Sequence, residues 1–553
     1  MIKQSLSQLI ESSIKEHWDL PALSDYKGVT LHYRDLARRI EKLHIIFEEC
    51  GLRRGDKVAI CSRNQANWGV VFLACITYGA VPVPILHEFK AGNIHHIVNH
   101  SDSRILFCGD VIWESLSQSE MPNLEAIIQL NDFSMLYVSR DEIMYAREHL
   151  NYKFGEKYPS RFSKSDVSYC HDALPDNLAM ISYTSGTSGF SKGVMIPHRA
   201  LLSNIEFARG VHPQIGSSSN VVSMLPSAHM YGCMFEFLFE ITVGAHVQFL
   251  TRIPSPRIIL EAFDTIKPDL IIAVPLIIEK IYKQKLQPIL NKMSVKVLLK
   301  VPVIDQKIQQ RIKDELVKSF GGNFKEIIIG GAPFNKEADA FFHKIGFPYT
   351  IGYGMTECAP IISYAPWKEL KLYSCGRVAP NMEIRIDSTD PVNVPGEIQV
   401  KGANVMLGYY KNPEATAASF TEDGWMKTGD MGVLDREGFL FIKGRCKSMI
   451  LGPSGQNIYP EEIESVINNM PYVSESLVIE DNGKLVALVY PDMDAAAADG
   501  INGGEGIQKK MDEIIGQVNT DMPNYSKIAE VRIYPEEFEK TPKRSIKRYL
   551  YQK

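Results

Sequence analysis

A segment rich in glycine and hydroxyl side chains ends in a lysine, and these residue types suit phosphate binding. Residues 183–194 read YTSGTSGFSKGV, with an apolar, strand-like lead-in at 178–181. The glycines let backbone N–H groups point at anionic oxygens, and Lys192 adds a mobile positive charge. A solvated Gly/Ser turn is the alternative. The Walker spacing is absent, which disfavours an ordinary P-loop NTPase. Hydroxyl or backbone donors come from Thr184, Ser185, Gly186, Thr187, Ser188 and Gly189.

Three more segments carry groups that suit a nucleotide and its metal. Residues 351–357 read IGYGMTE, and the Glu357 carboxylate is the kind of ligand that Mg²⁺ prefers. Residues 425–430 read WMKTGD, and Asp430 offers two acceptor oxygens to a vicinal diol. Residues 330–333 read GGAP after a buried run, so a flat ligand can lie against bare backbone. The alternatives are a helix cap, a Gly-Asp turn and a tight strand-to-helix turn.

The elements that must position these segments alternate between strand and helix patterns. Strands are expected at 56–60, 80–84, 103–108, 221–225, 246–250, 270–273 and 326–330, with helices at 31–50 and 68–78. Such alternation predicts a mostly parallel sheet covered by helices. Runs at 383–387 and 396–400 predict short antiparallel strands. Beyond residue 444 a helix is expected at 460–467 and a strand at 485–490, and 495–506 is expected to be a solvated insertion.

Length and composition restrict the function classes. The chain has 553 residues, which predicts at least two domains, and a formal net charge of -5, which argues against a nucleic-acid binder. Nine cysteines without paired metal spacing indicate reduced thiols in a cytoplasmic protein. The longest apolar stretch, residues 68–86, contains Gly79, Pro82 and Pro84, which favours a buried helix and strand over a membrane span. Peripheral membrane contact and a homodimer remain open.

Over residues 25–550 these motifs together resemble the adenylate-forming enzymes, which include acyl-CoA synthetases, luciferases and peptide-synthetase adenylation domains. The resemblance implies a large α/β N-terminal domain of stacked αβα subdomains with a small β-barrel-like subdomain, and a mobile α+β C-terminal domain. By that match Tyr353 stacks on adenine, Thr356 binds a phosphate, and Glu357 holds Mg²⁺ together with Thr187. Asp430 binds ribose and Arg445 the ribose or phosphate. The implied nucleotide pocket also includes Gly331, Ala332, Pro333, Gly354 and Met355.

The resemblance also places a hinge and a departure near the C-terminus. It implies an N-terminal domain over 1–443, a hinge over 444–447 that contains Lys447, and a C-terminal domain over 448–553. Relatives carry a catalytic lysine where this chain has Ser545, and that lysine stabilises charge during adenylation. Lys543 and Lys547 flank this position, and Lys547 is the predicted substitute. A solvated basic tail is the alternative.

The segment at 225–232, LPSAHMYG, resembles the entrance to the acyl pocket of long-chain acyl-CoA synthetases, with His229 at the gate. Relatives that activate amino acids have an aspartate where this chain has Met230, and an unpaired buried ammonium is costly. Six neighbouring side chains suit either an apolar tunnel or plain core: Met224, Met230, Met234, Phe235, Phe237 and Phe239.

These observations predict an ATP-dependent ligase that activates a medium- to long-chain fatty acid through acyl-AMP and transfers it to CoA, with ATP, Mg²⁺ and CoA as ligands. One alternative is an enzyme of the same fold with a carrier-protein acceptor. Another, motivated by Ser545, is a non-catalytic nucleotide-binding homologue.

Overall fold

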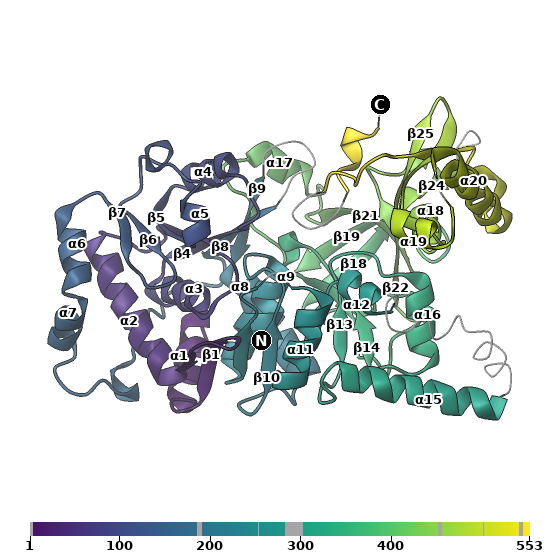
Figure 1. Cartoon of the computed structure of the whole chain (residues 1–553). Helices are drawn as coiled ribbons and strands as arrows, with labels where there is room; N and C mark the ends of the chain where they lie inside the picture. Colours follow the sequence, from purple (N-terminus) through teal and green to yellow (C-terminus); the bar gives the residue numbers. More distant parts are fainter. Residues whose placement is uncertain are drawn as a thin grey trace.

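The computed structural model describes residues 4–184, 191–252, 254–282, 302–451, 456–501, 503–540 and 546–552. Most of the chain forms a large α/β part built of several sheets and the helices around them, and a small α+β unit follows at the C-terminal end (Figure 1). The predicted fold class is confirmed. None of the helices in the described ranges is long and apolar enough to cross a bilayer.

The first sheet has the strand order β4-β3-β5-β6-β7, and only its edge strand β7 runs antiparallel to its neighbour. Its strands are β3 (Lys57–Cys61), β4 (Val81–Ile85), β5 (Ser103–Cys108), β6 (Ala126–Gln129) and β7 (Met135–Val138). Its helices are α2 (Tyr33–Glu49), α3 (Ala66–Tyr78), α4 (Ala91–His100), α5 (Asp110–Trp113), α6 (Asp141–Glu148) and α7 (Leu150–Lys157).

Helix α3 is buried almost throughout, and strand β4 follows it, as the apolar stretch predicts. The helix ends at Gly79, whose φ of 88° is a left-handed conformation that glycine adopts without strain. Trp68 and Phe72 of α3 pack edge-on against Phe237. The six side chains of the tunnel hypothesis, Phe237 among them, are all at most 6% exposed and belong to the core.

The second sheet has the order β2-β1-β11-β10, and the parallel bridge between Val221 and Leu270 joins it to β12-β13-β14. The strands of the first of these two sheets are β1 (Pro21–Asp25), β2 (Thr30–His32), β10 (Asn220–Ser223) and β11 (His246–Phe249). Those of the other are β12 (Ile271–Ala273), β13 (Ile327–Ile329) and β14 (Tyr349–Ile351). The helices nearby in sequence are α1 (Leu6–Glu16), α8 (His198–Val211), α9 (Met230–Cys233), α10 (Phe239–Thr242), α11 (Pro256–Ile266), α12 (Pro275–Ile281), α15 (Pro302–Ser319) and α16 (Lys336–Lys344).

Short antiparallel sheets complete the N-terminal part, as expected from residues 383–387 and 396–400. One contains β8 (Leu178–Thr184), β9 (Lys192–Pro197) and β20 (Gly408–Tyr409). The others contain β15 (Tyr353–Gly354), β16 (Ile361–Tyr364) and β17 (Arg377–Val378), and β18 (Met382–Asp387), β19 (Gly396–Gly402), β21 (Met426–Leu434) and β22 (Leu440–Arg445). Helix α17 (Pro413–Ala418) follows β20.

The C-terminal residues pack around a hydrophobic cluster of their own, which extends from Ile450 to Val531. Its elements are β23 (Ile450–Leu451), β24 (Asn457–Ile458), α18 (Pro460–Ile467), β25 (Val473–Asp481), β26 (Lys484–Pro491), α19 (Met493–Ala498), α20 (Gly503–Asp521) and β27 (Glu530–Ile533). Most described residues of 495–506 are exposed, as expected for a solvated insertion, and the segment also contains α19 and the start of α20, which the sequence did not predict. Asp492 caps α19 by accepting a hydrogen bond from the Ala495 N–H, and the alanines that follow favour a helix. The hinge at 444–447 stays a prediction.

Candidate active site

Tyr353, Asp430 and Arg445 form a connected polar group. Asp430 is only 6% exposed. The Tyr353 hydroxyl donates to its Oδ2 at 2.7 Å, and the Arg445 Nε lies 2.9 Å from its Oδ1. Burial raises the pKa of Asp430, while the Arg445 charge and the Tyr353 hydrogen bond oppose that rise. The Arg445 side chain is 65% exposed, whereas the Asp430 side chain is 9% exposed, so the ion pair lies at the boundary between the interior and the surface.

Lys192, Tyr409 and Glu357 form a second group. The Lys192 ammonium lies 4.8 Å from the centre of the Tyr409 ring, within the range of a cation–π interaction. The hydroxyl of the same ring donates a 2.9 Å hydrogen bond to Glu357 Oε1. Tyr409 therefore connects the lysine after the phosphate-loop segment to the predicted metal ligand.

Strand pairing explains why these two groups form. Tyr409 of β20 pairs with Val194 of β9, so its ring falls near the start of β9, where Lys192 lies. Glu357 follows β15 in a short 3₁₀ turn over Thr356–Cys358. A Cβ at Gly354 would collide with the carbonyl oxygen of Pro360, so only glycine allows this close approach.

The same 3₁₀ turn contains Thr356, which is 5% exposed, and the preceding Met355 is half-buried. The backbone N–H of Met406, near β20, donates to the Glu357 carbonyl at 2.9 Å. The main chain of the motif is therefore fixed to the segment that leads into β20, while the Glu357 side chain stays half-exposed.

The glycine-rich segment after β13 lies close to Tyr231 of α9, the helix that His229 caps. Gly331 has a φ of 87°, and Gly331, Ala332 and Pro333 are exposed although β13 itself is buried. His229 caps α9, where its Nδ1 accepts from the Tyr231 N–H at 3.2 Å. The Tyr231 hydroxyl donates to the Ile328 carbonyl at 3.0 Å, so α9 is tied to β13.

Part of the predicted phosphate loop lies outside the described residues. This concerns Ser185, Gly186, Thr187, Ser188 and Gly189, and with Thr187 the second predicted metal ligand. Thr184 ends β8 and pairs with Lys192 at the start of β9, so the structure places both ends of the loop side by side.

The predicted C-terminal residues are separate from both polar groups. Lys447 is exposed in the turn that follows Arg445. Lys547 forms an ion pair with Glu539 at 2.5 Å, and this contact raises its pKa. Lys543 and Ser545 lie outside the described residues. The catalytic role of Lys547 stays a prediction.

Two tyrosines of this site escaped the sequence reasoning. Tyr409 and Tyr231 are joined to the predicted residues by contacts between distant parts of the chain, and nothing in their local sequence marks them. Tyr409 could have been found only by predicting how the strands pair, because strand pairing brings it near the Glu357 carboxylate.

The residues present fit a magnesium nucleotide. Among the described residues no three His, Cys, Asp or Glu side chains gather as a metal cluster. The half-exposed Glu357 carboxylate is the type of ligand that Mg²⁺ takes, since this ion is held by one or two carboxylates together with substrate phosphates. Tyr409 donates to one Glu357 oxygen, and the second oxygen would be available to the cation.

A large α/β part that holds Lys192 near Glu357 through Tyr409, and Asp430 beside Arg445, followed by a small α+β unit, defines an adenylate-forming enzyme. The chain belongs to the AMP-binding enzyme family: the profile of that family matches residues 10–410, and the profile of the AMP-binding enzyme C-terminal domain matches residues 447–553. The resemblance read from the motifs is confirmed.

Named relatives and solved structures agree with this assignment. The chain is 26% identical to the long-chain-fatty-acid–CoA ligase FadD15 of Mycobacterium bovis, over 90% of this chain and 86% of that protein. It is 28% identical to a long-chain-fatty-acid–CoA ligase of Escherichia coli O6:H1, over 85% and 82%. The fold matches ATP-bound MatB of Rhodopseudomonas palustris with a TM-score of 0.77 at 22% identity, over 99% and 98% of the two chains. It matches o-succinylbenzoate CoA synthetase of Bacillus subtilis, solved with its acyl-adenylate, with a TM-score of 0.74 at 22% identity, over 100% and 98%.

Proposed function

We propose that this protein is an AMP-forming fatty acid–CoA ligase that uses Mg²⁺ and ATP. The observation that carries the proposal is the joint arrangement of Asp430 with Arg445 and of Glu357 with Lys192 through Tyr409. One group offers a buried carboxylate to a ribose, and the other offers a cation and a metal-binding carboxylate to phosphates. The names of the relatives support an acid–CoA ligase that acts on long-chain acids.

In the first half-reaction a carboxylate oxygen of the acid attacks the α-phosphorus of ATP, the P–O bond to pyrophosphate breaks, and acyl-AMP forms. Lys192 would neutralise phosphate oxygens and Glu357 would hold Mg²⁺, while Tyr409 fixes both. Asp430 would bind the ribose hydroxyls and Tyr353 would orient that carboxylate. The Mg²⁺ ion supplies charge neutralisation at the phosphates.

In the second half-reaction the CoA thiolate attacks the acyl carbon, and AMP leaves. AMP is a far better leaving group than the oxide of the free acid, which is why adenylation precedes transfer. Rotation of the C-terminal domain about residues 444–447 would exchange the groups that face the acyl-AMP.

A fatty acid is proposed as the substrate because His229 and Met230 occur in the segment that resembles the acyl entrance of long-chain enzymes. Met230 is 1% exposed and cannot pair with an ammonium, which argues against an amino acid.

The test is pyrophosphate release with Mg·ATP for acids from acetate to palmitate, each with and without CoA. We expect release to increase with chain length and to continue over many turnovers only with CoA. If pyrophosphate release from medium- or long-chain acids continues only with a carrier protein, that protein rather than CoA would be the acyl acceptor. Absence of release from every acid, despite ATP binding, would contradict the ligase proposal.

A further inference from the structure

A cleft unrelated to the nucleotide groups lies between α2, the strands β6 and β7, and the pair α6–α7. Its volume is about 380 Å³. These elements occupy the end of the molecule opposite to the C-terminal domain, well away from β21 and β22 (Figure 1). A cleft of this size is large enough for a small ligand.

Three cationic side chains line the cleft, and their hydrogen bonds go to neutral oxygens. Arg39 Nη1 donates to the Asn67 side-chain oxygen and Lys42 Nζ to the Asn151 side-chain oxygen, both at 2.6 Å. Arg147 donates to the carbonyl of Phe133 at 2.6 Å and to that of Asp132 at 3.1 Å. Over the described ranges, no ion pair joins Arg39, Lys42 or Arg147 to a carboxylate.

The neighbouring cations outside the cleft are paired, which sets these three apart. Arg38 lies 3.7 Å from Asp35, and Lys153 of α7 lies 2.6 Å from Glu49. Burial lowers the pKa of Lys42, and the charges of Arg38, Arg39 and Arg147 lower it further, so positive charge is concentrated around this residue. Carboxylates act on the other two cations without forming an ion pair, Asp35 and Asp25 on Arg39 and Asp132 on Arg147. Two carboxylates, Asp132 and Glu148, also line the cleft, but both residues are exposed.

Apolar side chains also line the cleft, among them Phe133, Met135 and Leu150, which are half-buried, and three asparagines lie beside them, Asn67, Asn131 and Asn151. The cations come from two elements, Arg39 and Lys42 from α2 and Arg147 from α6, and apolar side chains line the same cleft. Positive charge beside apolar surface suits a ligand with an anionic head and an apolar body. Charge-assisted hydrogen bonds to a phosphate or carboxylate are stronger than the bonds to neutral amides that now occupy these donors.

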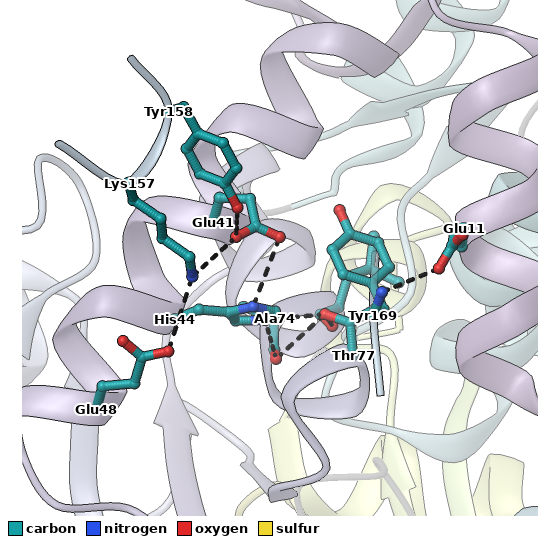
Figure 2. Close-up of polar contacts among 10 residues, drawn as sticks. Glu11, Glu41, His44, Glu48, Ala74, Thr77, Lys157, Tyr158 and Tyr169 are labelled. Carbon is teal, nitrogen blue, oxygen red and sulfur yellow. Dashed lines mark hydrogen bonds and ion pairs between the residues drawn. The ribbon is translucent and has the colours of Figure 1, made fainter. Parts of the chain in front are cut away.

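The wall formed by α2 is fixed from its other face, so the cleft is preformed. Figure 2 shows Glu41 accepting a 2.5 Å hydrogen bond from Tyr158 and pairing with Lys157 at 3.4 Å. His44 Nε2 contacts the Ala74 carbonyl at 3.1 Å, which ties α2 to α3. Lys157 also reaches Glu48 at 3.7 Å, so α7 is joined to α2 across this side. A preformed site loses little conformational entropy when a ligand binds.

We propose that this cleft binds a small amphipathic anion, with its phosphate or carboxylate at Arg39, Lys42 and Arg147 and its apolar part against Phe133, Met135 and Leu150. The site is distinct from the proposed acyl and nucleotide site and does not depend on the proposed function.

The test uses the full chain and octyl phosphate as the probe, with binding followed by isothermal titration calorimetry. We expect one site per chain, with binding weakened at least about tenfold in Lys42→Met and in Arg147→Met, because each loses a charge-assisted hydrogen bond. Arg34→Met, the matched control on the same helix, removes a cation paired with Asp19 and should bind like the wild type. Octanol, which lacks the anion, and inorganic phosphate, which lacks the apolar body, should each bind more weakly than octyl phosphate.

The binding comparison requires that Lys42→Met and the control have the same thermal unfolding midpoint as the wild type. If Arg147→Met fails to fold, the result for Lys42→Met is used alone. Equal binding by wild type and Lys42→Met would overturn the proposal, since the probe would then lie elsewhere, including in the acyl site. Sedimentation with phosphatidylglycerol vesicles tests whether the cleft instead binds the anionic headgroup of a membrane lipid. Vesicle binding that depends on Lys42, without octyl phosphate binding, would also overturn it in favour of a membrane contact.

Discussion

The Tyr409 hydroxyl donates a 2.9 Å hydrogen bond to Glu357 Oε1, and the ring of this tyrosine is also the surface on which the Lys192 ammonium rests at 4.8 Å. Tyr409 is 9% exposed, so its position is fixed by packing. One side chain thus contacts both the predicted phosphate-binding lysine and the candidate metal ligand.

Tyr409→Phe should separate these two roles, because it keeps the ring and removes the hydroxyl. We expect the apparent affinity for Mg²⁺ in the pyrophosphate-release assay to fall about three- to tenfold, in line with the loss of one hydrogen bond. Tyr410→Phe is the matched control, since it loses a 2.8 Å hydrogen bond to Asp102 on an exposed surface. An unchanged Mg²⁺ dependence in Tyr409→Phe would contradict the positioning role.

Asp430→Asn should weaken ATP binding. The change removes the charge that faces Arg445 and one acceptor for a ribose hydroxyl, so we expect the Kd for ATP to rise about ten- to a hundredfold. Calorimetric titration with ATP measures this directly. Asp423→Asn removes an exposed carboxylate paired with Arg385 at 2.5 Å and should leave the Kd unchanged. Equal affinity in Asp430→Asn and wild type would exclude the ribose role.

Lys547→Ala tests whether this lysine supplies the charge that Ser545 cannot. If it does, adenylation should slow by about a hundredfold, the cost typical of a lost donor at a developing charge. Pyrophosphate release measures that step, and thioester formation from added acyl-AMP measures the other step, which should change much less. Lys540→Ala is the control, because Lys540 pairs with Glu475 at 2.5 Å within the C-terminal domain. A normal adenylation rate in Lys547→Ala would shift the hypothesis to Lys543.

His44→Gln should make stability less sensitive to acid. Burial lowers the pKa of His44 to about 3, below its value of 6.5 in a model compound, so the unfolded chain binds this proton more readily than the folded one (Figure 2). The stability that depends on neutral His44 is fully present above pH 6.5 and is lost as the pH falls toward 3. Between pH 7 and pH 5 this amounts to about 2 kcal/mol of unfolding free energy.

The measurement is the thermal midpoint of wild type and His44→Gln at pH 7 and pH 5. The midpoint of the variant should fall less on acidification than that of the wild type. The buried Glu240 changes stability with pH in the opposite direction. Burial raises its pKa to about 8, so its contribution to stability is lost as the pH rises from 4.5 toward 8. A parallel acid shift in both proteins would contradict the assignment to His44.

The sequence predicted those parts of the site that lie within single motifs. Asp430 and Glu357 could be named as candidates because their motifs are short and local, and their roles stay predictions. The helix over Pro460–Ile467 was predicted because proline occupies its first turn. Tyr409 was missed because its partner Glu357 lies 52 positions away, and strand pairing rather than local sequence joins them. The α19 helix was missed because a glycine- and alanine-rich composition was given more weight than the Asp492 cap. The cleft at Lys42 was also missed, since its walls come from segments that only the tertiary fold brings together.

Arg445 is the last residue of β22, and the predicted hinge continues from it into the turn that contains Lys447. A ribose hydroxyl that takes Asp430 Oδ1 competes with Arg445 for this oxygen. If the small domain turns at this hinge as predicted, nucleotide binding and the orientation of the small domain would be linked by one coupling free energy, and each would alter the other by the same factor. The rate of AMP release would therefore depend on the orientation of the small domain as well as on the contacts in the nucleotide pocket.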